Sequence, residues 1–499
     1  MDFKLSIETL YDIDFNKDFE LSKLNNIPKF ITNNLSKLET IKENNIESLI
    51  VSNSSKSEIL SELNTEILSN SDSDSDSDSV SESESESESQ SESESESESE
   101  SQSESESESE SESESESQSE TGKNTFLGLF LNNKYYIIKK LGSGTFSTVW
   151  LAYYKNDPNN IFYYAIKIQD SESYDDGIRE AKYLDILKTL ENDNIIRIHE
   201  WFIYESNIQD VSNKPNICMV LDLLGGTLQD VIKKGIYSND IDEEKIYKII
   251  IQITNVLNIL NTKLNAIHTD LKPQNILIKK ENKKITLFIN TFVELFNQIE
   301  EESINSKIII DIHNKINKQI KNIKKFDLYQ IDKDEDIIIV ISDFGTLKPI
   351  SRIKFTDNIQ TRYYRSPEVI LMCNYNEKVD IWSLGCIIYE LLTGELLFYP
   401  KKDKHYSTDF HHIYWIIELL GKIPLKVIEQ SDNRNHFFNK KNNFKIDVLE
   451  KNDFNILLKK LNKNLSSKML NLLDNIFKID YQERFSCIEI LDYLERCVF

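Results

Sequence analysis

The sequence lacks the patterns that mark membrane-spanning and secreted proteins. No run of about eighteen apolar residues occurs in its 499 positions, and the N-terminal "MDFKLSIETLYD" lacks the basic-then-apolar order of a signal peptide. The five cysteines are an odd number without CxxC spacing, which favours reduced thiols over disulfide bonds. We therefore expect a cytosolic or nuclear protein that is not secreted and has no membrane partner.

Basic residues are absent from one long segment. Residues 71–120 alternate serine with acids, and they hold 21 of the 84 Asp and Glu but no Lys or Arg. The other 449 residues carry the remaining 63 acids against 58 bases, which is only −5 of the total charge of −26. Apart from Val80 the segment has no apolar residue to bury, so we expect a disordered acidic tail. Three roles fit it: a solvating spacer, bait for basic proteins or nucleic-acid-binding segments, or a substrate of another, acid-directed kinase.

The rest of the chain predicts an α+β fold with two lobes. Residues 1–70 show some helical periodicity but no evident core, which indicates a partly helical segment. From Tyr135, "YYIIKKLGSGTFSTVWLAYY" alternates apolar and polar residues around a Gly-rich turn, as a β-hairpin does. Further strand patterns and one helical pattern complete a small, sheet-rich lobe over 135–224. Helical periods dominate a larger lobe over 225–499, which begins at a glycine pair that we interpret as a hinge.

Residues 281–335 interrupt this larger lobe. Asn275 and Asp343 are 68 positions apart, whereas the two strands expected at "NILIKK" and "DIIIVISDFG" need a loop of only roughly 2–5 residues. Isoleucines from Ile309 to Ile323 recur at helical spacing, and the lysines among them fall mostly on other faces. The segment is therefore predicted to be an insert with an amphipathic helix that packs on its own domain.

The Gly-rich turn could cradle phosphates. Phosphoryl transfer requires such a cradle, divalent metal ions, neutralisation of charge and a positioned acceptor hydroxyl. "GSGTFS" at 142–147 offers flexible backbone amides, although Ser147 stands where a third glycine is expected. Lys167 in "YAIKI" would contact the phosphates, held by Glu180 on the next helix, with Glu172 as the alternative partner.

The stretch "HTDLKPQN" at 268–275 supplies the chemistry that the turn lacks. Asp270 can orient the acceptor hydroxyl and take its proton, Lys272 can neutralise the transferring group, and Asn275 can hold a metal ion. Asp343 in "SDFG" adds a charged ligand, and these oxygen donors suit Mg²⁺.

Three more residues occur in the order that a kinase needs. Glu368 ends "RYYRSPE" and requires a partner, for which Arg484 in "DYQERFS" is suitably placed. Asp380 in "VDIWSLG" opens a buried helix and can brace the backbone of the catalytic loop. So many matches in the right order and context are not explained by chance, and they predict a protein kinase.

Residues 135–499 resemble a eukaryotic-type protein kinase of the CMGC group, and most closely the SR-protein-specific kinases, which phosphorylate serines in Arg-Ser repeats. The resemblance rests on "FSTVWLA", "ICMV", "HTDLKPQN", "IQTRYYRSPEV" and "HIYWIIELLGKIP" followed by "FFNKK". That family also carries a spacer between the catalytic loop and the DFG motif. The resemblance implies the bilobal protein kinase fold, ATP and Mg²⁺, and transfer of the γ-phosphate to serine or threonine of protein substrates.

The resemblance also assigns residues. The nucleotide-binding set that it implies is Leu141, Gly142, Ser143, Gly144, Val149, Lys167, Glu180, Leu221 as gatekeeper, and the backbone of Asp222 and Leu224. It implies that Arg362 and Arg365 shape the substrate-binding turn.

Thr269 stands where most kinases have an arginine that clamps a phosphate on the activation loop. A threonine has no charge and cannot form a charge-assisted hydrogen bond to phosphate. The loop between Asp343 and Glu368 is also short and has no Thr-x-Tyr pair. We therefore hypothesise that the loop is ordered by its own packing and that the kinase is constitutively active.

The substrate groove departs from the family pattern. Glu418 stands where one arginine-binding acid is expected, but His411 stands at another such position, with Asp409 two residues earlier. The DFG triplet also replaces the Asp-Leu-Gly that is frequent in the family. These departures weaken the inference to Arg-rich protein substrates more than the inference to kinase activity.

Two alternatives stay open: another CMGC kinase with a different peptide preference, and a kinase-fold scaffold that works through its acidic tail. The scaffold is disfavoured because Lys167, Asp270 and Asp343 are all present. We expect a monomer without a direct nucleic-acid partner. An acidic groove would repel the tail, so efficient autophosphorylation there is not expected.

Overall fold

The computed structural model describes residues 126–154, 162–205, 215–233, 243–299, 303–320, 337–350, 358–448 and 465–498. The predictions for residues 1–70 and 71–120 lie outside these ranges. Among the described helices, none is long and apolar enough to cross a membrane.

The small lobe is built on a six-stranded antiparallel sheet with the strand order β1-β2-β3-β4-β6-β5. Its strands are β1 (Phe130–Leu131), β2 (Tyr135–Ser143), β3 (Ser147–Tyr154), β4 (Phe162–Gln169), β5 (Ile198–Tyr204) and β6 (Asn216–Asp222). The hairpin predicted around the Gly-rich turn is β2–β3, with Ser143 opposite Thr148 next to the turn. Both faces of this sheet are covered, which explains why its strands are so rich in large apolar side chains.

Helix α5 (Tyr174–Lys188) packs beside β5 and β6. The pattern "GIREAKYLDILKTL" at 177–190 predicts this helix, and the helix begins three residues earlier, at Tyr174. Ile178, Leu184 and Leu187 follow one another at intervals of six and three residues, and all three are buried. This apolar stripe fixes the rotation of the helix and carries Glu180 inward as well, where that side chain is also buried.

The chain that precedes the hairpin covers another part of the sheet. Leu127 and Leu131 are buried in one cluster with Trp150 and the strand residues around it. Phe126 extends this cluster by edge-on ring contacts at 6.1 Å with Trp150 and also with Tyr204. The folded region therefore starts at least nine residues before Tyr135, where the alternating pattern begins.

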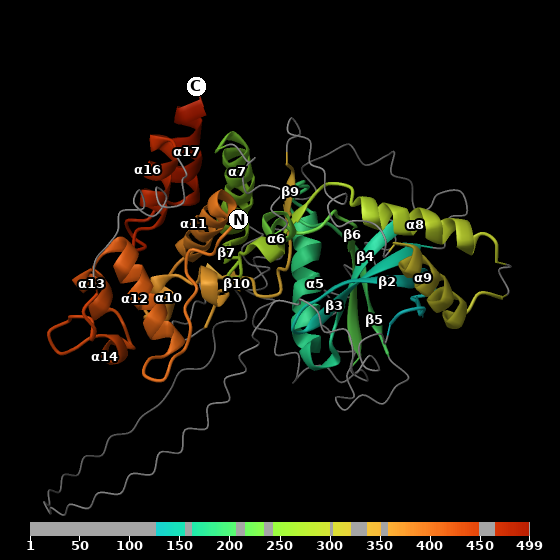
Figure 1. Cartoon of the computed structure of the whole chain (residues 1–499), viewed down its shortest axis with the longest axis horizontal. Helices are drawn as coiled ribbons and strands as arrows, with labels where there is room; N and C mark the ends of the chain where they lie inside the picture. Colours follow the sequence, from blue (N-terminus) through green and yellow to red (C-terminus); the bar gives the residue numbers. More distant parts are fainter. Residues whose placement is uncertain are drawn as a thin grey trace, which may run out of the picture. The chain divides into compact units, whose positions relative to one another are not determined.

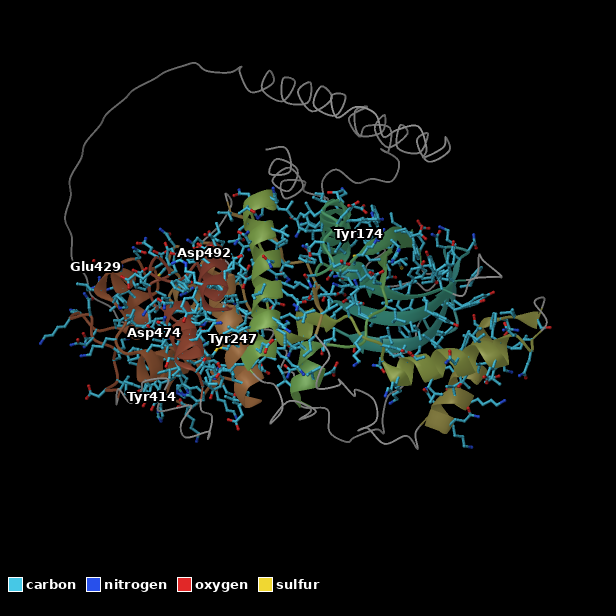
Figure 2. The ribbon with its side chains drawn as sticks, turned by 90° about the horizontal axis from the view of Figure 1, so that it is seen from above. Tyr174, Tyr247, Tyr414, Glu429, Asp474 and Asp492 are labelled. Atoms are coloured by element: carbon cyan, nitrogen blue, oxygen red, sulfur yellow. The ribbon has the colours of Figure 1, made fainter. Side chains whose placement is uncertain are left out.

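The predicted insert supplies helices α8 (Lys283–Phe296) and α9 (Ser306–Ile320). The buried faces of the two helices pack on Tyr136, Ile138 and Leu151 of β2 and β3, so the insert of the large lobe lies against the sheet of the small lobe. The residues that form this packing on the helix side are Phe288, Phe292, Phe296, Ile309, Ile312 and Ile316. Figures 1 and 2 show both helices alongside the sheet, away from α5. The part of the predicted pattern that includes Ile323 lies outside the described residues.

The large lobe is mainly helical. Its helices are α6 (Leu228–Lys233), α7 (Glu243–Ile259), α10 (Pro367–Ile370), α11 (Lys378–Thr393), α12 (Thr408–Leu420), α13 (Leu425–Glu429), α14 (Arg434–Phe437), α16 (Ser467–Ile476) and α17 (Cys487–Val498). Helix α11 is buried from Val379 to Leu392 and forms the centre of this lobe. A Cβ atom on Gly385 of α11 would lie 2.6 Å from a methyl group of Ile476, so only glycine allows α16 to approach this closely.

Two short antiparallel pairs position the catalytic segments. Strand β8 (Ile276–Ile278) pairs with β9 (Ile339–Ile341), as the predicted insert required. Strand β7 (Ala266–Ile267) pairs with β10 (Lys348–Pro349). These pairs hold the catalytic loop, which lies between β7 and β8, beside the segment between β9 and β10.

Candidate active site

A buried lysine links the two lobes. Lys167 on β4 donates to Glu180 of α5 at 2.7 and 2.8 Å, and to Asp343 at 2.9 Å. Burial alone lowers the pKa of Lys167, but the adjacent Glu180 and Asp343 carboxylates outweigh it and raise that pKa above its ordinary value. Burial likewise opposes the Asp343 carboxylate, yet Lys167 holds its pKa below the ordinary range. Glu180 is therefore the partner of Lys167, whereas Glu172 lies in a short turn before α5.

The catalytic loop gathers a cluster around Asp270. Its Oδ1 accepts a 2.6 Å hydrogen bond from Thr361 Oγ1, and its Oδ2 lies 2.8 Å from Lys272 Nζ. Lys272 also donates to Thr361 Oγ1 at 2.9 Å. The sequence predicted Asp270 and Lys272 but not Thr361, because a threonine in a loop has no distinctive pattern. A hydroxyl group is thus already held at the predicted base by the predicted charge-neutralising lysine.

The residues predicted to hold a metal ion suit Mg²⁺ by their chemistry. Asn275 donates through Nδ2 to the backbone oxygen of Asp270 at 2.9 Å and to its Oδ2 at 3.2 Å. Because these hydrogen bonds use the side-chain nitrogen of Asn275, its Oδ1 is left as an acceptor for a metal ion. Asp343 supplies a charged carboxylate. Hard oxygen donors of this kind are the ligands that Mg²⁺ prefers. Bound there, Mg²⁺ would screen the negative charge of the ATP phosphates.

The predicted nucleotide wall comes from strands β2, β3 and β6. Gly142 lies opposite Val149, and Gly144 N donates to Ser147 O at 2.8 Å, which closes the Gly-rich turn. Leu141 packs on the cluster under the insert helices. Leu221 lies across from Ala165 on β4, a small residue that the sequence analysis did not select.

The connection between the lobes follows β6. Asp222 is the last residue of that strand, and its Oδ1 lies 2.6 Å from Nε2 of His199. Leu224 is partly buried and precedes the glycine pair. A Cβ on Gly225 would lie 2.0 Å from the backbone oxygen of Lys280, so the backbone of the hinge runs directly against the end of β8. The insert also touches the hinge, because Asn282 donates to the Gly225 oxygen at 2.8 Å.

Asp380 braces the catalytic loop as predicted from its place at the start of α11. Its two carboxylate oxygens accept the backbone N–H groups of His268 at 2.8 Å and Thr269 at 3.0 Å. Burial raises the pKa of Asp380 to about 6 despite these hydrogen bonds. The conformation that it supports includes a positive φ of 70° at Thr269, which a non-glycine residue adopts only when its surroundings impose it.

Glu368 and Arg484 form a buried, bidentate ion pair. Arg484 Nη1 lies 2.6 Å from Glu368 Oε1 and Nη2 lies 2.9 Å from Oε2, and both side chains are almost fully buried. The guanidinium also donates to the backbone oxygens of Lys378 and Lys478. The pair connects the end of the activation segment to the segment before α17.

Hydrogen bonds that involve no phosphate hold the described part of the segment that follows DFG. Thr269 Oγ1 donates to the Thr346 backbone oxygen at 2.7 Å, and Thr346 Oγ1 donates back to the His268 oxygen at 3.2 Å. Farther along, the Gln360 backbone N–H donates to the Thr269 oxygen at 2.9 Å. Arg365 donates to the Gln360 backbone oxygen through Nε and Nη2. Gln360 was not selected from the sequence.

The residues predicted to bind substrate lie around α12. Arg362 forms an ion pair with Asp409 at the start of that helix. His411 Nε2 lies 3.0 Å from Asp403 Oδ2. Glu418 lies in the last two turns of α12 and is partly buried.

The site thus holds a lysine for phosphates, oxygen ligands for a metal ion and a carboxylate beside a hydroxyl, which is the arrangement of an enzyme that moves a phosphoryl group onto a hydroxyl group. A family model described as the protein kinase domain matches residues 135–494, so the chain belongs to the protein kinase family. It is a serine/threonine kinase of the CMGC type, similar to the SR-protein kinases.

Two curated relatives and one solved structure illustrate the similarity. The serine/threonine-protein kinase SRPK of Physarum polycephalum is 34% identical over 328 residues, which cover 64% of this chain and 74% of the relative. Protein kinase dsk1 of Schizosaccharomyces pombe is 25% identical over 391 residues, which cover 62% of this chain and 70% of the relative. The crystal structure of a kinase domain aligns with a TM-score of 0.52 at 25% identity, covering 73% of this chain and 96% of that chain.

Proposed function

We propose that this chain is a serine/threonine protein kinase whose activation segment is held without phosphate through its described residues 358–368, so that it is constitutively active. Residues 351–357 of the segment lie outside the described ranges. The observation that carries the proposal is the buried side chain of Gln360. Its Nε2 donates to Val379 O and Ser383 Oγ, both at 2.9 Å, and to Tyr364 O at 3.2 Å. Its Oε1 accepts from Ser366 N at 3.0 Å and Ser366 Oγ at 3.1 Å.

These hydrogen bonds attach the segment directly to the centre of the large lobe. Val379 and Ser383 belong to α11, whereas Tyr364 and Ser366 belong to the substrate-binding turn. A buried amide with all its hydrogen bonds formed is costly to withdraw, because each orphaned group costs about 1–3 kcal/mol. Gln360 therefore takes the place of the arginine and phosphate that hold the activation loop in most kinases. No second kinase is then needed to activate this chain.

The Thr269 hydroxyl supports the same proposal from the other end of the segment. Its reciprocal contact with Thr346 joins the catalytic loop to the residues after DFG without any charge. Gln360, with a φ of 67°, and Asp343, with a φ of 63°, also have positive backbone angles. Such conformations persist only where packing and hydrogen bonds impose them.

The predicted residues then divide the chemistry. Lys167 would hold ATP phosphates, Asn275 and Asp343 would hold Mg²⁺, and Lys272 would offset charge on the transferring group. Asp270 would position the acceptor hydroxyl and accept its proton. Thr361 keeps the side chains of Asp270 and Lys272 in place until a substrate arrives.

The acceptor sequence is a separate question. The resemblance to SR-protein kinases proposes Arg-Ser-rich proteins, with Glu418 as an arginine-binding acid. The alternative, a different peptide preference, is favoured by one observation: Asp409 and Asp403 are already paired with Arg362 and His411. An acid that is already in an ion pair with an arginine, as Asp409 is, attracts a substrate arginine less strongly.

Phosphate transfer from labelled Mg-ATP by the purified full chain tests the proposal. The chain is treated with phosphatase, freed from it, and compared with untreated chain and with Asp343→Ala. Equal, Asp343-dependent rates before and after treatment are expected. Loss of most activity on dephosphorylation would refute constitutive activity, and no transfer from any preparation would refute the kinase itself and favour the scaffold.

A further inference from the structure

A basic surface lies beside the substrate-binding turn. The loop between α11 and α12 carries Lys401, Lys402, Lys404 and His405, and all four side chains are exposed. Among the described residues, none of the three lysines forms an ion pair with an acid. We call these four residues the basic loop.

Aromatic stacking fixes this loop against the turn. Tyr399, just before the loop, stacks on Tyr363 with ring centroids 5.2 Å apart, and Lys401 Nζ lies 4.7 Å above the Tyr399 ring. Tyr363 is two residues from Thr361, which contacts Asp270. The positive charges are therefore near the position where a peptide must present its acceptor hydroxyl.

Asp403 and Asp409, the two acids nearest the basic loop in the sequence, bind other partners and not its lysines. Asp403 accepts the backbone N–H groups of His405 at 2.7 Å and Tyr406 at 2.8 Å, and it is paired with His411. Asp409 is paired with Arg362. Between residues 396 and 448 the sequence has nine Lys and Arg but six Asp and Glu, although the whole chain carries −26. This stretch of the large lobe thus has a net charge opposite in sign to that of the protein as a whole.

We propose that the basic loop selects serines flanked by acids, and that residues 71–120 of this chain are such a substrate. This segment has 25 serines that alternate almost throughout with 21 Asp and Glu. No base interrupts it, so several acids of a bound stretch would face the basic loop at once. The proposal departs from the expectation that an acidic groove repels the tail, because the described loop at residues 401–405 carries three lysines and one acid.

The reaction is the one that the site already supports. Serine Oγ forms a bond to the γ-phosphorus of ATP while the bond to the β–γ bridging oxygen breaks. The serine proton passes to Asp270, and ADP leaves. Each transfer adds about −1.5 to −2 charges to the segment, so earlier products strengthen the attraction of the remaining serines to the basic loop. The inference rests on the proposed kinase activity and names its substrate class.

The test compares three peptides of equal length: alternating Ser-Glu, Ser-Gln and Ser-Arg. We expect the full chain to have the highest kcat/KM with Ser-Glu. Replacement of Lys401, Lys402 and Lys404 together by Glu should lower the ratio of the Ser-Glu to the Ser-Gln rate by about tenfold, as expected for three exposed charges that reverse sign. Raising ionic strength should lower that ratio in the unmodified chain, because exposed charges are screened by salt.

A matched variant distinguishes the effect of charge on the basic loop from the effect of the net charge of the whole chain. Lys307, Lys315 and Lys318 are exposed on α9, and their replacement by Glu makes the same change in net charge on the insert. This variant should keep the peptide preference of the unmodified chain. Equal losses in both variants would overturn the role of the basic loop, as would a preference for Ser-Arg that the loop variant does not alter.

The segment itself is tested as a protein substrate. The full-length Asp343→Ala chain presents residues 71–120 but should not phosphorylate them, so it serves as acceptor for the active chain. Mass spectrometry should find new phosphates within 71–120, fewer with the loop variant as enzyme. Phosphate on the Ser-Arg peptide but none on this segment would refute the inference and leave the kinase intact. No transfer to any acceptor would refute the proposed function instead.

Discussion

Replacement of Gln360 by alanine should inactivate the enzyme without unfolding it. The substitution leaves Ser366 N–H buried without its acceptor and removes the hydrogen bonds to Val379 O and Ser383 Oγ. One orphaned buried group costs about 1–3 kcal/mol and two further lost hydrogen bonds about 0.5–1.5 kcal/mol each, or about 2–6 kcal/mol in all. The loss falls on the activation segment, because two of these bonds join that segment to α11 and the third, with Ser366, closes it on itself.

A shift of 2 kcal/mol against the ordered segment lowers its population by up to about 30-fold, and kcat/KM should fall accordingly. Steady-state kinetics with Mg-ATP and a serine peptide give this ratio, while hydrogen exchange reports protection of residues 358–368. Asn216→Ala is the matched control, since it removes a buried amide that donates to Gln169 O at 2.9 Å in the small lobe. A Gln360→Ala chain with more than half of the original kcat/KM and unchanged exchange would refute the reasoning.

Three other predictions follow from buried contacts. Arg484→Ala leaves the Glu368 carboxylate buried without its partner, so it should lower the free energy of unfolding by about 3–5 kcal/mol in urea titrations, and a change below 1 kcal/mol would contradict this. Because burial raises the pKa of Asp380 to about 6 in the folded chain, against about 3.9 when unfolded, the folded state binds the extra proton between these values. The stabilisation by this group is thus present below about pH 4 and lost as the pH rises to about 6. Asp380→Asn should remove this pH dependence from the free energy of unfolding. Parallel plots of that free energy against pH for the two proteins would disprove the prediction. Gly225→Ala places a Cβ against the Lys280 oxygen, so nucleotide affinity measured by titration calorimetry should fall, whereas an unchanged affinity would exclude tight packing at the hinge.

Charged and glycine-rich motifs made the centre of the site predictable. Lys167, Asp270 and Asp343 carry functions that only a few residue types can perform, so their spacing in the sequence identifies them. The strands were predictable for a different reason, since period-2 alternation of apolar side chains describes a sheet directly. The Gln360 network was not predictable in the same way, because a neutral amide becomes informative only when its five hydrogen bonds are known, two of them to α11.

The packing of the insert was also beyond the sequence. The isoleucine spacing around Ile312 predicts an amphipathic helix, but a helix face does not specify which surface it meets. Ring packing by Tyr136 and Tyr153 of the small lobe with Phe296 supplies that surface. The two tyrosines lie more than 140 positions from Phe296, and only the fold shows that they are neighbours.

The insert gives the molecule more than one connection between its lobes. The chain crosses first at Asp222–Gly226, then leaves the large lobe after β8 to place α8 and α9 on the sheet of the small lobe, and re-enters the large lobe at β9. A protein joined by one flexible crossing can rotate its two halves freely about it. Here any rotation of one lobe against the other must also break the hydrogen bond from Asn282 to the Gly225 oxygen or separate α8 and α9 from the sheet of the small lobe. The opening through which a nucleotide would enter and leave can therefore widen less on the side of the hinge.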